Sequence, residues 1–256
     1  MPVKSIPNNY EMKSLDIQVV LKSLGKLEVN VNRITNYPLP IPNPQFPNRK
    51  MIDEGYIKYQ CNWIHSEPLS LNEIAELNQW RNQLYELGLI GEYDDGIGFG
   101  NISIRYYQPG QFIISGTQTG NLSTLNEHHY TRVTNFDLER NFLTCCGPIQ
   151  ASSESLTHAT LYQANPTVNA VIHVHHLQLW ENLMYKVPTT DKNVSYGTPE
   201  MAKEILRLFR EDNLMKTKIL VMSGHEEGII CFGKNLQEAG NILLDKYSQL
   251  ITAKPM

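Results

Sequence analysis

The stretch AVIHVHH, residues 170–176, joins an apolar run of the kind that forms a buried strand to three histidines. Side chains at positions i and i+2 of a strand point to the same face, so His173 and His175 can approach one point together while His176 points away. Two neutral imidazoles placed in this way can share a metal ion, and zinc suits them well. The alternative is a polar patch without a metal.

Strand and helix patterns alternate along the chain around this stretch. Ser70, with Glu73 three residues later, predicts a helix start, and alternating residues on both sides of Pro109-Gly110 predict a β-hairpin over 102–114. Further helices are expected over 153–164, 198–211 and 235–251, and further strands over 168–175, 218–222 and 229–232. This interleaving predicts a layered α/β domain.

Composition excludes several classes of protein. The 256 residues include 22 basic and 26 acidic side chains with no basic stripe, so neither nucleic acid nor an anionic membrane is an expected partner. No apolar run approaches the roughly 20 residues that span a bilayer, and the polar N-terminus resembles neither a signal peptide nor an anchor. The four cysteines form no disulfide framework and no zinc motif, which favours a reducing, cytoplasmic location.

A proline-rich segment lies near the N-terminal end of the sequence. Residues 37–48, YPLPIPNPQFPN, hold five of the fourteen prolines, which favours an extended strap across a surface. A metal-binding domain is expected over residues 66–256, and residues 1–65 form an N-terminal extension that contains this strap.

Polar residues that could complete a site lie on either side of the strand. Glu154 follows two serines at a predicted helix start, where it can point at a metal or substrate or simply match the helix dipole. His158 lies one turn later on the same face. His225, between Gly224 and Glu226, follows an apolar strand and is the best candidate for a third metal ligand, with Glu226 and Glu227 as alternatives.

Two loops rich in glycine and hydroxyl groups have the character of an anion or polyol site. Exposed backbone N–H groups around Gly100 and Asn101, and around Ser115 and Gly116, could hold phosphate, although ordinary turns are an equal alternative. Neither loop contains lysine or arginine to neutralise a phosphate, so an unphosphorylated substrate is an alternative.

Taken in order, these pieces resemble the class II aldolase and adducin family from about Ser70 to Leu250. The pieces are Gly100–Arg105, Ser115-Gly116 with Leu122, Ser152–Glu154 with His158 and Tyr162, Ala170–His175, Tyr196–Thr198, and Gly228 with Asn235, Leu236 and Ala239.

The resemblance implies a three-layer α/β/α fold with a central mixed, largely antiparallel sheet, and a homotetramer with active sites at subunit interfaces. It implies zinc or another divalent transition metal bound by three histidines, which makes His173 and His175 ligands, and a sugar-phosphate-like substrate. The positions that match the family's phosphate site are Gly100, Asn101, Ser115, Gly116, Ser152 and Ser153. Tyr196 and Tyr247 are candidates for groups that a neighbouring subunit contributes.

The third ligand is where this chain departs from the family's pattern. Family members present Asn-His-Gly or His-His-Gly, whereas this chain has Gly224-His225-Glu226-Glu227-Gly228. Gapless alignment through Gly228 places Glu227 at the ligand position, and a two-residue shift restores His225. We favour His225 because imidazole matches the other two ligands, although two histidines and a glutamate also suit zinc.

The resemblance also implies a reaction. Glu154 matches the catalytic acid/base of the aldolases, whereas the related epimerases tend to have aspartate there, so we expect an aldolase-type lyase that makes or breaks a C–C bond through a metal-stabilised enediolate. Burial would raise the pKa of Glu154 and a nearby metal would lower it. An epimerase, dehydratase or decarboxylase, or a non-catalytic adducin-like interaction module, are the alternatives.

Overall fold

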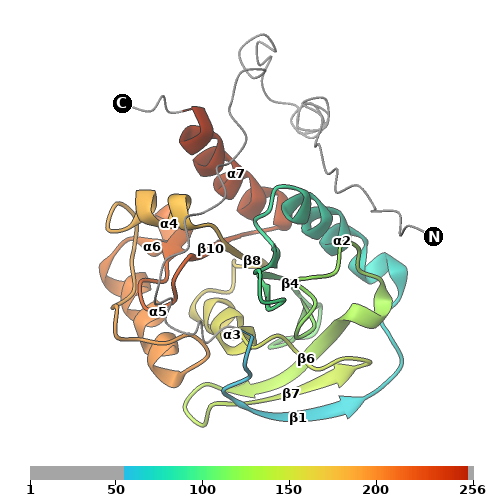
Figure 1. The fold of residues 1–256 in the computed structure, drawn as a ribbon. Coiled ribbons are helices and arrows are strands. Elements are labelled where there is room, and N and C mark those ends of the chain that lie inside the picture. Colours follow the sequence, from blue (N-terminus) through green and yellow to red (C-terminus); the bar gives the residue numbers. More distant parts are fainter. Residues whose placement is uncertain (1–54, 253–256) are drawn as a thin grey trace, which may run out of the picture. The chain divides into compact units, whose positions relative to one another are not determined.

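The computed structural model describes residues 55–252, so the predicted strap at 37–48 lies outside the described residues. Helices and strands alternate as expected (Figure 1). The strands are β1 (Gln60–His65), β2 (Gly91–Glu92), β3 (Gly98–Phe99), β4 (Asn101–Arg105), β5 (Phe112–Ser115), β6 (Tyr130–Asp137), β7 (Phe142–Gly147), β8 (Ala170–His175), β9 (Ile219–Val221) and β10 (Gly228–Gly233). The helices are α2 (Leu71–Glu86), α3 (Ser155–Ala164), α4 (Leu177–Leu183), α5 (Pro199–Glu211), α6 (Leu214–Thr217) and α7 (Leu236–Thr252).

Eight of these strands form one mixed sheet. Their order is β1-β7-β6-β5-β4-β8-β10-β9, and a separate two-stranded sheet joins β2 to β3. The edge strand β1 runs parallel to β7, and every other neighbouring pair in the large sheet is antiparallel. The expected mixed, largely antiparallel sheet is therefore confirmed, and residues 60–65 of the predicted extension contribute its edge strand.

Helices cover both faces of the sheet, which gives three layers (Figure 1). On one face α7 packs against β8 and β10, and it also contacts α2 and α4. On the other face α3 packs against α5, which contacts α6. The three-layer α/β/α fold is confirmed, and the buried side chains of α3 and α5 form one hydrophobic core with the sheet residues that face them.

Local sequence signals place the helix starts. Ser70 and Glu73 form the expected capping box at α2, where the Ser70 backbone N–H donates to Glu73 over 2.9 Å. Pro199 is the first residue of α5, where its missing N–H costs nothing, and the Thr198 hydroxyl accepts a hydrogen bond from the Met201 N–H. Both predicted starts are confirmed.

The register of the sheet brings the predicted polar residues to one edge. Asn101, at the start of β4, lies opposite His173 of β8, and Gly228, at the start of β10, lies opposite His175. Beyond β5, Gly116 forms an isolated antiparallel bridge with Ala151, directly before the turn into α3. Segments from five parts of the sequence therefore meet at one end of the central strands.

Candidate metal centre

Strand β8 positions the first two histidines. It is hydrogen-bonded to β4 on one side and β10 on the other, and all six of its residues are buried. Val171 belongs to the hydrophobic core shared with α3, and strand alternation puts His173 and His175 on that same face. The two imidazoles therefore point toward the start of α3 rather than into the opposite layer.

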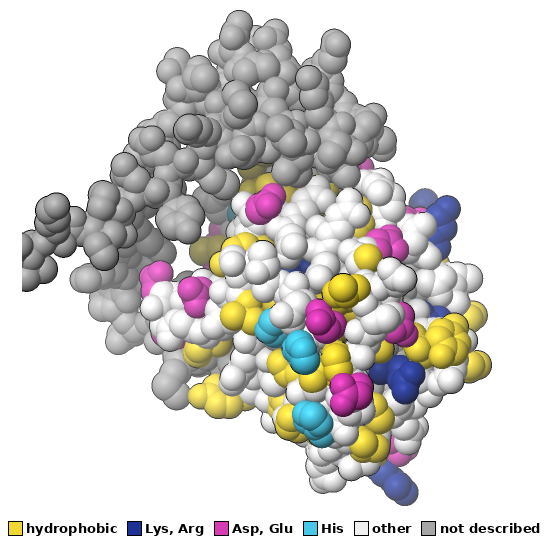
Figure 2. Space-filling model, turned by 90° about the vertical axis from the view of Figure 1, so that its right-hand side faces the viewer, with side chains coloured by type: hydrophobic (Ala, Val, Ile, Leu, Met, Phe, Trp, Pro, Cys, Tyr) yellow, Lys and Arg dark blue, Asp and Glu magenta, His cyan; other side chains and the backbone are white. Residues whose placement is uncertain are grey.

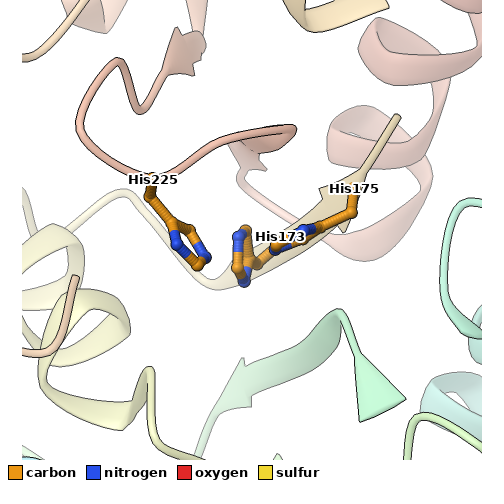
Figure 3. A group of neighbouring side chains, drawn as sticks. All are labelled: His173, His175 and His225. Carbon is orange, nitrogen blue, oxygen red and sulfur yellow. The ribbon is translucent and has the colours of Figure 1, made fainter. Parts of the chain in front are cut away.

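His225 approaches the pair from the turn between β9 and β10 (Figure 3). One ligand atom from each of His173, His175 and His225 lies within 4.8 Å of the others. All three side chains are buried, and Gly228 leaves them room, because a Cβ there would lie 2.6 Å from Cδ2 of His225. The three imidazoles have the spacing and chemistry to hold one divalent cation.

Neighbouring polar groups orient the two strand histidines. The Tyr93 hydroxyl lies 2.7 Å from Nδ1 of His175 and donates to Glu227 Oε2 over 3.2 Å. On the other ring, Nδ1 of His173 lies 3.3 Å from the Asn101 side-chain amide. Contacts at Nδ1 direct Nε2 toward the cluster, as metal-binding histidines require.

Burial keeps the imidazoles neutral. It lowers the pKa of His173 to about 3, and it lowers the pKa of His175 and of His225 well below the usual value, with neighbouring histidines adding to the effect. Neutral imidazole is the form that binds a metal. Nε2 of His173 is buried and has no hydrogen-bond partner among the described residues, as a donor atom reserved for a metal would be. The donor set therefore fits a divalent ion.

Glu154 lies beside this cluster. It is the N-cap residue of α3, it is fully buried, and one of its oxygens lies 3.8 Å from Nε2 of His225. Burial raises its pKa to about 7, against smaller lowering effects of the Thr157 hydroxyl and the Lys58 charge. Of the two effects weighed for its pKa, burial therefore dominates in the metal-free chain, and near neutral pH the carboxyl group can both accept and release a proton.

His158 lies one turn beyond Glu154 but does not join the three histidines. Its Nδ1 lies 2.7 Å from the Ser103 hydroxyl, which is 2.7 Å from the Tyr162 hydroxyl. Ser103 and Tyr162 thus fix the imidazole between β4 and α3, and burial lowers the pKa of His158 well below the usual value. It is therefore a buried residue of the interface between β4 and α3.

The residues expected to hold phosphate lie around the same end of the sheet. Gly100 has φ of +79°, and a Cβ there would lie 2.8 Å from the Ile90 side chain, so both the backbone conformation and the close contact with Ile90 require glycine. Ser115 ends β5 and accepts a hydrogen bond from the Ile102 N–H. Ser152 and Ser153 are buried in the turn that leads into Glu154.

Some of the other residues predicted for the site lie beside the three histidines, and others lie away from them. Glu226 is exposed, and Glu227, although buried, accepts its hydrogen bond from Tyr93 and is not part of the group of three. Tyr196 packs its ring 4.5 Å from that of His225, whereas Tyr247 packs against His176 at 5.4 Å. His65, His128 and His129 have no sequence context that marks a site, which predicts surface positions for them; His65 and His128 are exposed, whereas His129 is half-buried.

Sequence reasoning missed Tyr93 and Lys58. Tyr93 precedes the glycine-rich loop with no pattern that marks it, and only the fold brings it to His175. Lys58 precedes β1 within the predicted extension, and its ammonium lies 3.7 Å from the centre of the Tyr196 ring.

Comparison with known proteins agrees with this fold. Residues 92–244 match the class II aldolase and adducin N-terminal domain, and the chain belongs to that family. An L-fuculose 1-phosphate aldolase has a similar structure, with a TM-score of 0.54 and 18% identity over 74% of this chain and 91% of that one.

Two further structures share the fold. YgbL from Escherichia coli, a candidate aldolase/epimerase/decarboxylase, gives a TM-score of 0.53 at 17% identity and covers 72% of this chain and 92% of its own. A sugar-phosphate aldolase from Thermotoga maritima gives 0.52 at 15%, covering 72% and 97%. At these identities the similarity concerns the fold.

Surface and helix properties complete the description. On the face shown in Figure 2, basic and acidic side chains of the described residues are interspersed, and they form no large patch of a single charge. Within residues 55–252, no helix combines the length and apolar character needed to cross a bilayer.

Proposed function

We propose that this protein is a divalent-metal-dependent lyase that cleaves or forms a C–C bond in a sugar phosphate or a related hydroxy-carbonyl compound. One observation carries the proposal: three buried, neutral histidines lie within metal-binding distance of one another, next to a buried carboxyl group whose pKa is about 7. A metal-dependent aldolase needs these two parts, a Lewis acid and a proton carrier, side by side.

The three proposed metal ligands are His173, His175 and His225. A divalent ion bound there, zinc or another transition metal, would polarise the substrate carbonyl and stabilise the negative charge that develops when the C–C bond breaks. Three protein ligands leave a coordination position for substrate. The Tyr93 hydroxyl and the Asn101 amide hold the strand imidazoles in place.

Glu154 is the proposed proton carrier. In the cleavage direction its carboxylate takes the proton of the substrate hydroxyl as the C–C bond breaks, and the acid form returns a proton to the carbon left behind. In the metal-free chain burial raises the pKa of this carboxyl group to about 7, and a divalent ion bound beside it would lower that pKa, so the carboxylate form that accepts the proton would be available at neutral pH. Burial excludes water that would otherwise compete for the same proton.

Substrate binding is assigned to the rim of the site. Hydrogen-bonding groups of Gly100, Asn101, Ser115, Gly116, Ser152 and Ser153 would hold the phosphate or the sugar hydroxyls. The Gly116 N–H is not among these groups, because it donates to the His129 backbone oxygen over 2.8 Å. The isolated bridge between Gly116 and Ala151 supports this assignment, because it brings two of these segments together.

The first test measures metal content. Purified parent protein is expected to hold about one equivalent of zinc, cobalt or manganese per chain by elemental analysis, and the His173→Ala/His175→Ala double variant is expected to hold none. No metal in the parent after incubation with excess zinc would overturn the proposal and favour a non-catalytic, adducin-like interaction module.

The second test measures the reaction. Metal-loaded protein is screened for aldehyde release from ketose phosphates, beside Glu154→Gln and the exposed control Glu181→Gln. Loss of general acid–base catalysis costs about 10²- to 10⁴-fold in turnover, so Glu154→Gln should lose that much while keeping its metal. Release of carbon dioxide or of an epimer instead would assign decarboxylase or epimerase chemistry to the same residues.

We also propose a homotetramer, on the family's pattern. Light scattering of the purified chain should give four times the 29.3 kDa chain mass. A monomeric mass would remove the proposed contribution of a neighbouring subunit to the site.

A further inference from the structure

The candidate site needs a positive group for an anionic substrate, and its loops do not supply one. Arg81, which approaches the 119–120 turn, is buried and donates to the backbone oxygens of Thr119 and Gly120 over 2.9 and 3.0 Å. Arg105 donates to backbone oxygens at the end of α3, including Tyr162 O over 2.9 Å. These two guanidinium groups therefore brace the scaffold behind the loops.

Lys58 reaches the site from a different segment, the residues just before β1. Its backbone oxygen accepts a hydrogen bond from the Asn141 side chain over 2.8 Å. The adjacent Tyr59 hydroxyl contacts the backbone oxygens of Ala151 and Ser152, each over 2.9 Å. Lys58 is thus anchored directly against the turn that presents Ser152, Ser153 and Glu154.

The side chain of Lys58 packs against the ring of Tyr196, beside the site. Its ammonium lies 3.7 Å from the centre of the Tyr196 ring, and that ring lies 4.5 Å from the ring of His225. The Tyr196 hydroxyl accepts a hydrogen bond from the Tyr56 N–H over 3.2 Å, which fixes the ring. A cation–π contact of this kind orients an ammonium over the face of the ring.

The charge of Lys58 acts on the groups proposed for catalysis. Burial raises the pKa of Glu154, and Lys58 opposes this rise. The ammonium also lies against the Tyr196 ring, which packs on His225, so its charge lies beside the proposed metal centre.

We propose that Lys58 is the anion-binding residue of this site and that the substrate carries an oxyanion, a phosphate monoester or a carboxylate, beside Glu154. This inference rests on the proposed function for the identity of the site. An ammonium half-buried beside a partly dehydrated site binds an anion more strongly than a surface lysine does, because both screening and competition from water are reduced.

The test uses calorimetric titration of zinc-loaded protein with two probes, inorganic phosphate and glycolate. Lys58→Met keeps the aliphatic length and removes the charge, whereas Lys58→Arg keeps the charge. Lys216→Met is the matched control, because Lys216 is exposed and precedes β9 at the end of that strand remote from His225. Zinc content and the melting temperature check that each variant is folded and loaded.

We expect Lys58→Met to bind at least one probe about tenfold more weakly or worse, as loss of a hydrogen bond to a charged group implies, with Lys58→Arg intermediate and Lys216→Met unchanged. Weaker phosphate binding alone identifies a phosphorylated substrate, and weaker glycolate binding alone identifies a carboxylate beside the metal. Equal affinities of the parent and Lys58→Met for both probes would overturn the inference.

Failure of the inference is distinguishable from failure of the proposed function. If the parent binds zinc and both anions but Lys58→Met binds them equally well, the metal site stands and the role of Lys58 is wrong. If the parent binds no zinc, the proposed function fails. The same titration of metal-free protein then decides whether Lys58 holds the anions without a metal.

Discussion

Strand β8 and the turn over residues 222–228 contribute ligands to the same proposed centre by different physical means. His173 and His175 lie on a strand that is hydrogen-bonded on both sides, so the sheet register fixes both rings. His225 lies on a turn closed by a few bonds, among them Met222 N–H to Gly228 O at 2.9 Å and Gly228 N–H to His225 O at 3.0 Å. The strand pair is therefore a preformed half-site, and the turn completes it.

The largest expected effect is on zinc affinity, and it distinguishes the ligand of the turn from the two ligands of the strand. Loss of a residue that hydrogen-bonds to a metal ligand typically lowers metal affinity about 10- to 100-fold, and loss of a ligand itself should cost more. His225→Ala should therefore bind zinc more than about 100-fold more weakly while keeping detectable affinity. The double variant His173→Ala/His175→Ala should bind none. Competition with a chromogenic chelator measures both, with exposed His128→Ala as control. Full zinc affinity in His225→Ala would place the third ligand elsewhere.

The next effect concerns Glu154, which lies against the turn half of the site. Burial raises its pKa from 4.5 to about 7, so between these pH values the native carboxyl group holds a proton that the unfolded chain has released. The free energy of unfolding therefore falls as pH rises through this window, by about 3 kcal/mol from this group.

Urea unfolding of metal-free protein at pH 5 and pH 8 measures this fall. The stability of the parent relative to Glu154→Gln should drop between the two pH values by about that amount, and because the buried histidines are common to both chains, their contributions cancel. The control Glu181→Gln should follow the parent. A pH-independent difference between the parent and Glu154→Gln would show that the native carboxyl group titrates normally.

The contrast between strand and turn also explains what the sequence could predict. Strand alternation alone placed His173 and His175 on one face, because a two-residue period tolerates no other arrangement. Nothing comparable distinguishes His225 from Glu227, since the turn carries no period and its path depends on Glu227 adopting φ of +69°. The choice of third ligand stays a prediction that the arrangement of the rings supports.

Long-range contacts were the other part that the sequence could not predict. Strands β6 and β7 were not predicted. Burial does not alternate regularly along β6, and its pairing with β7 shifts register between Val133 and Asn135. Tyr93 and Lys58 reach the site through contacts that span 82 and 138 positions of the sequence, and no local pattern encodes such a contact. Helix starts such as Ser70 were predictable because capping is local.

A smaller effect should come from the partner of His175. Tyr93→Phe removes the hydroxyl that lies 2.7 Å from Nδ1 and leaves the aromatic packing against Phe99, so zinc affinity should fall about 10- to 100-fold. Tyr107→Phe, at an exposed position, is the control. The chelator assay reads both, and unchanged affinity in Tyr93→Phe would mean that the sheet alone orients the strand half of the site.

The smallest expected effect decides between His225 and Glu227. Glu227→Gln keeps an oxygen that can accept the Tyr93 hydrogen bond and keeps the same backbone requirement at φ of +69°, but it removes the carboxylate. If Glu227 only orients Tyr93, zinc affinity should fall by less than about tenfold, which is the lower limit for loss of a residue that supports a metal ligand. If Glu227 is a ligand, the loss should equal that of His225→Ala, because a neutral amide is a far weaker zinc ligand than a carboxylate. Side-by-side titration of these two variants therefore shows which residue of the turn completes the half-site on β8.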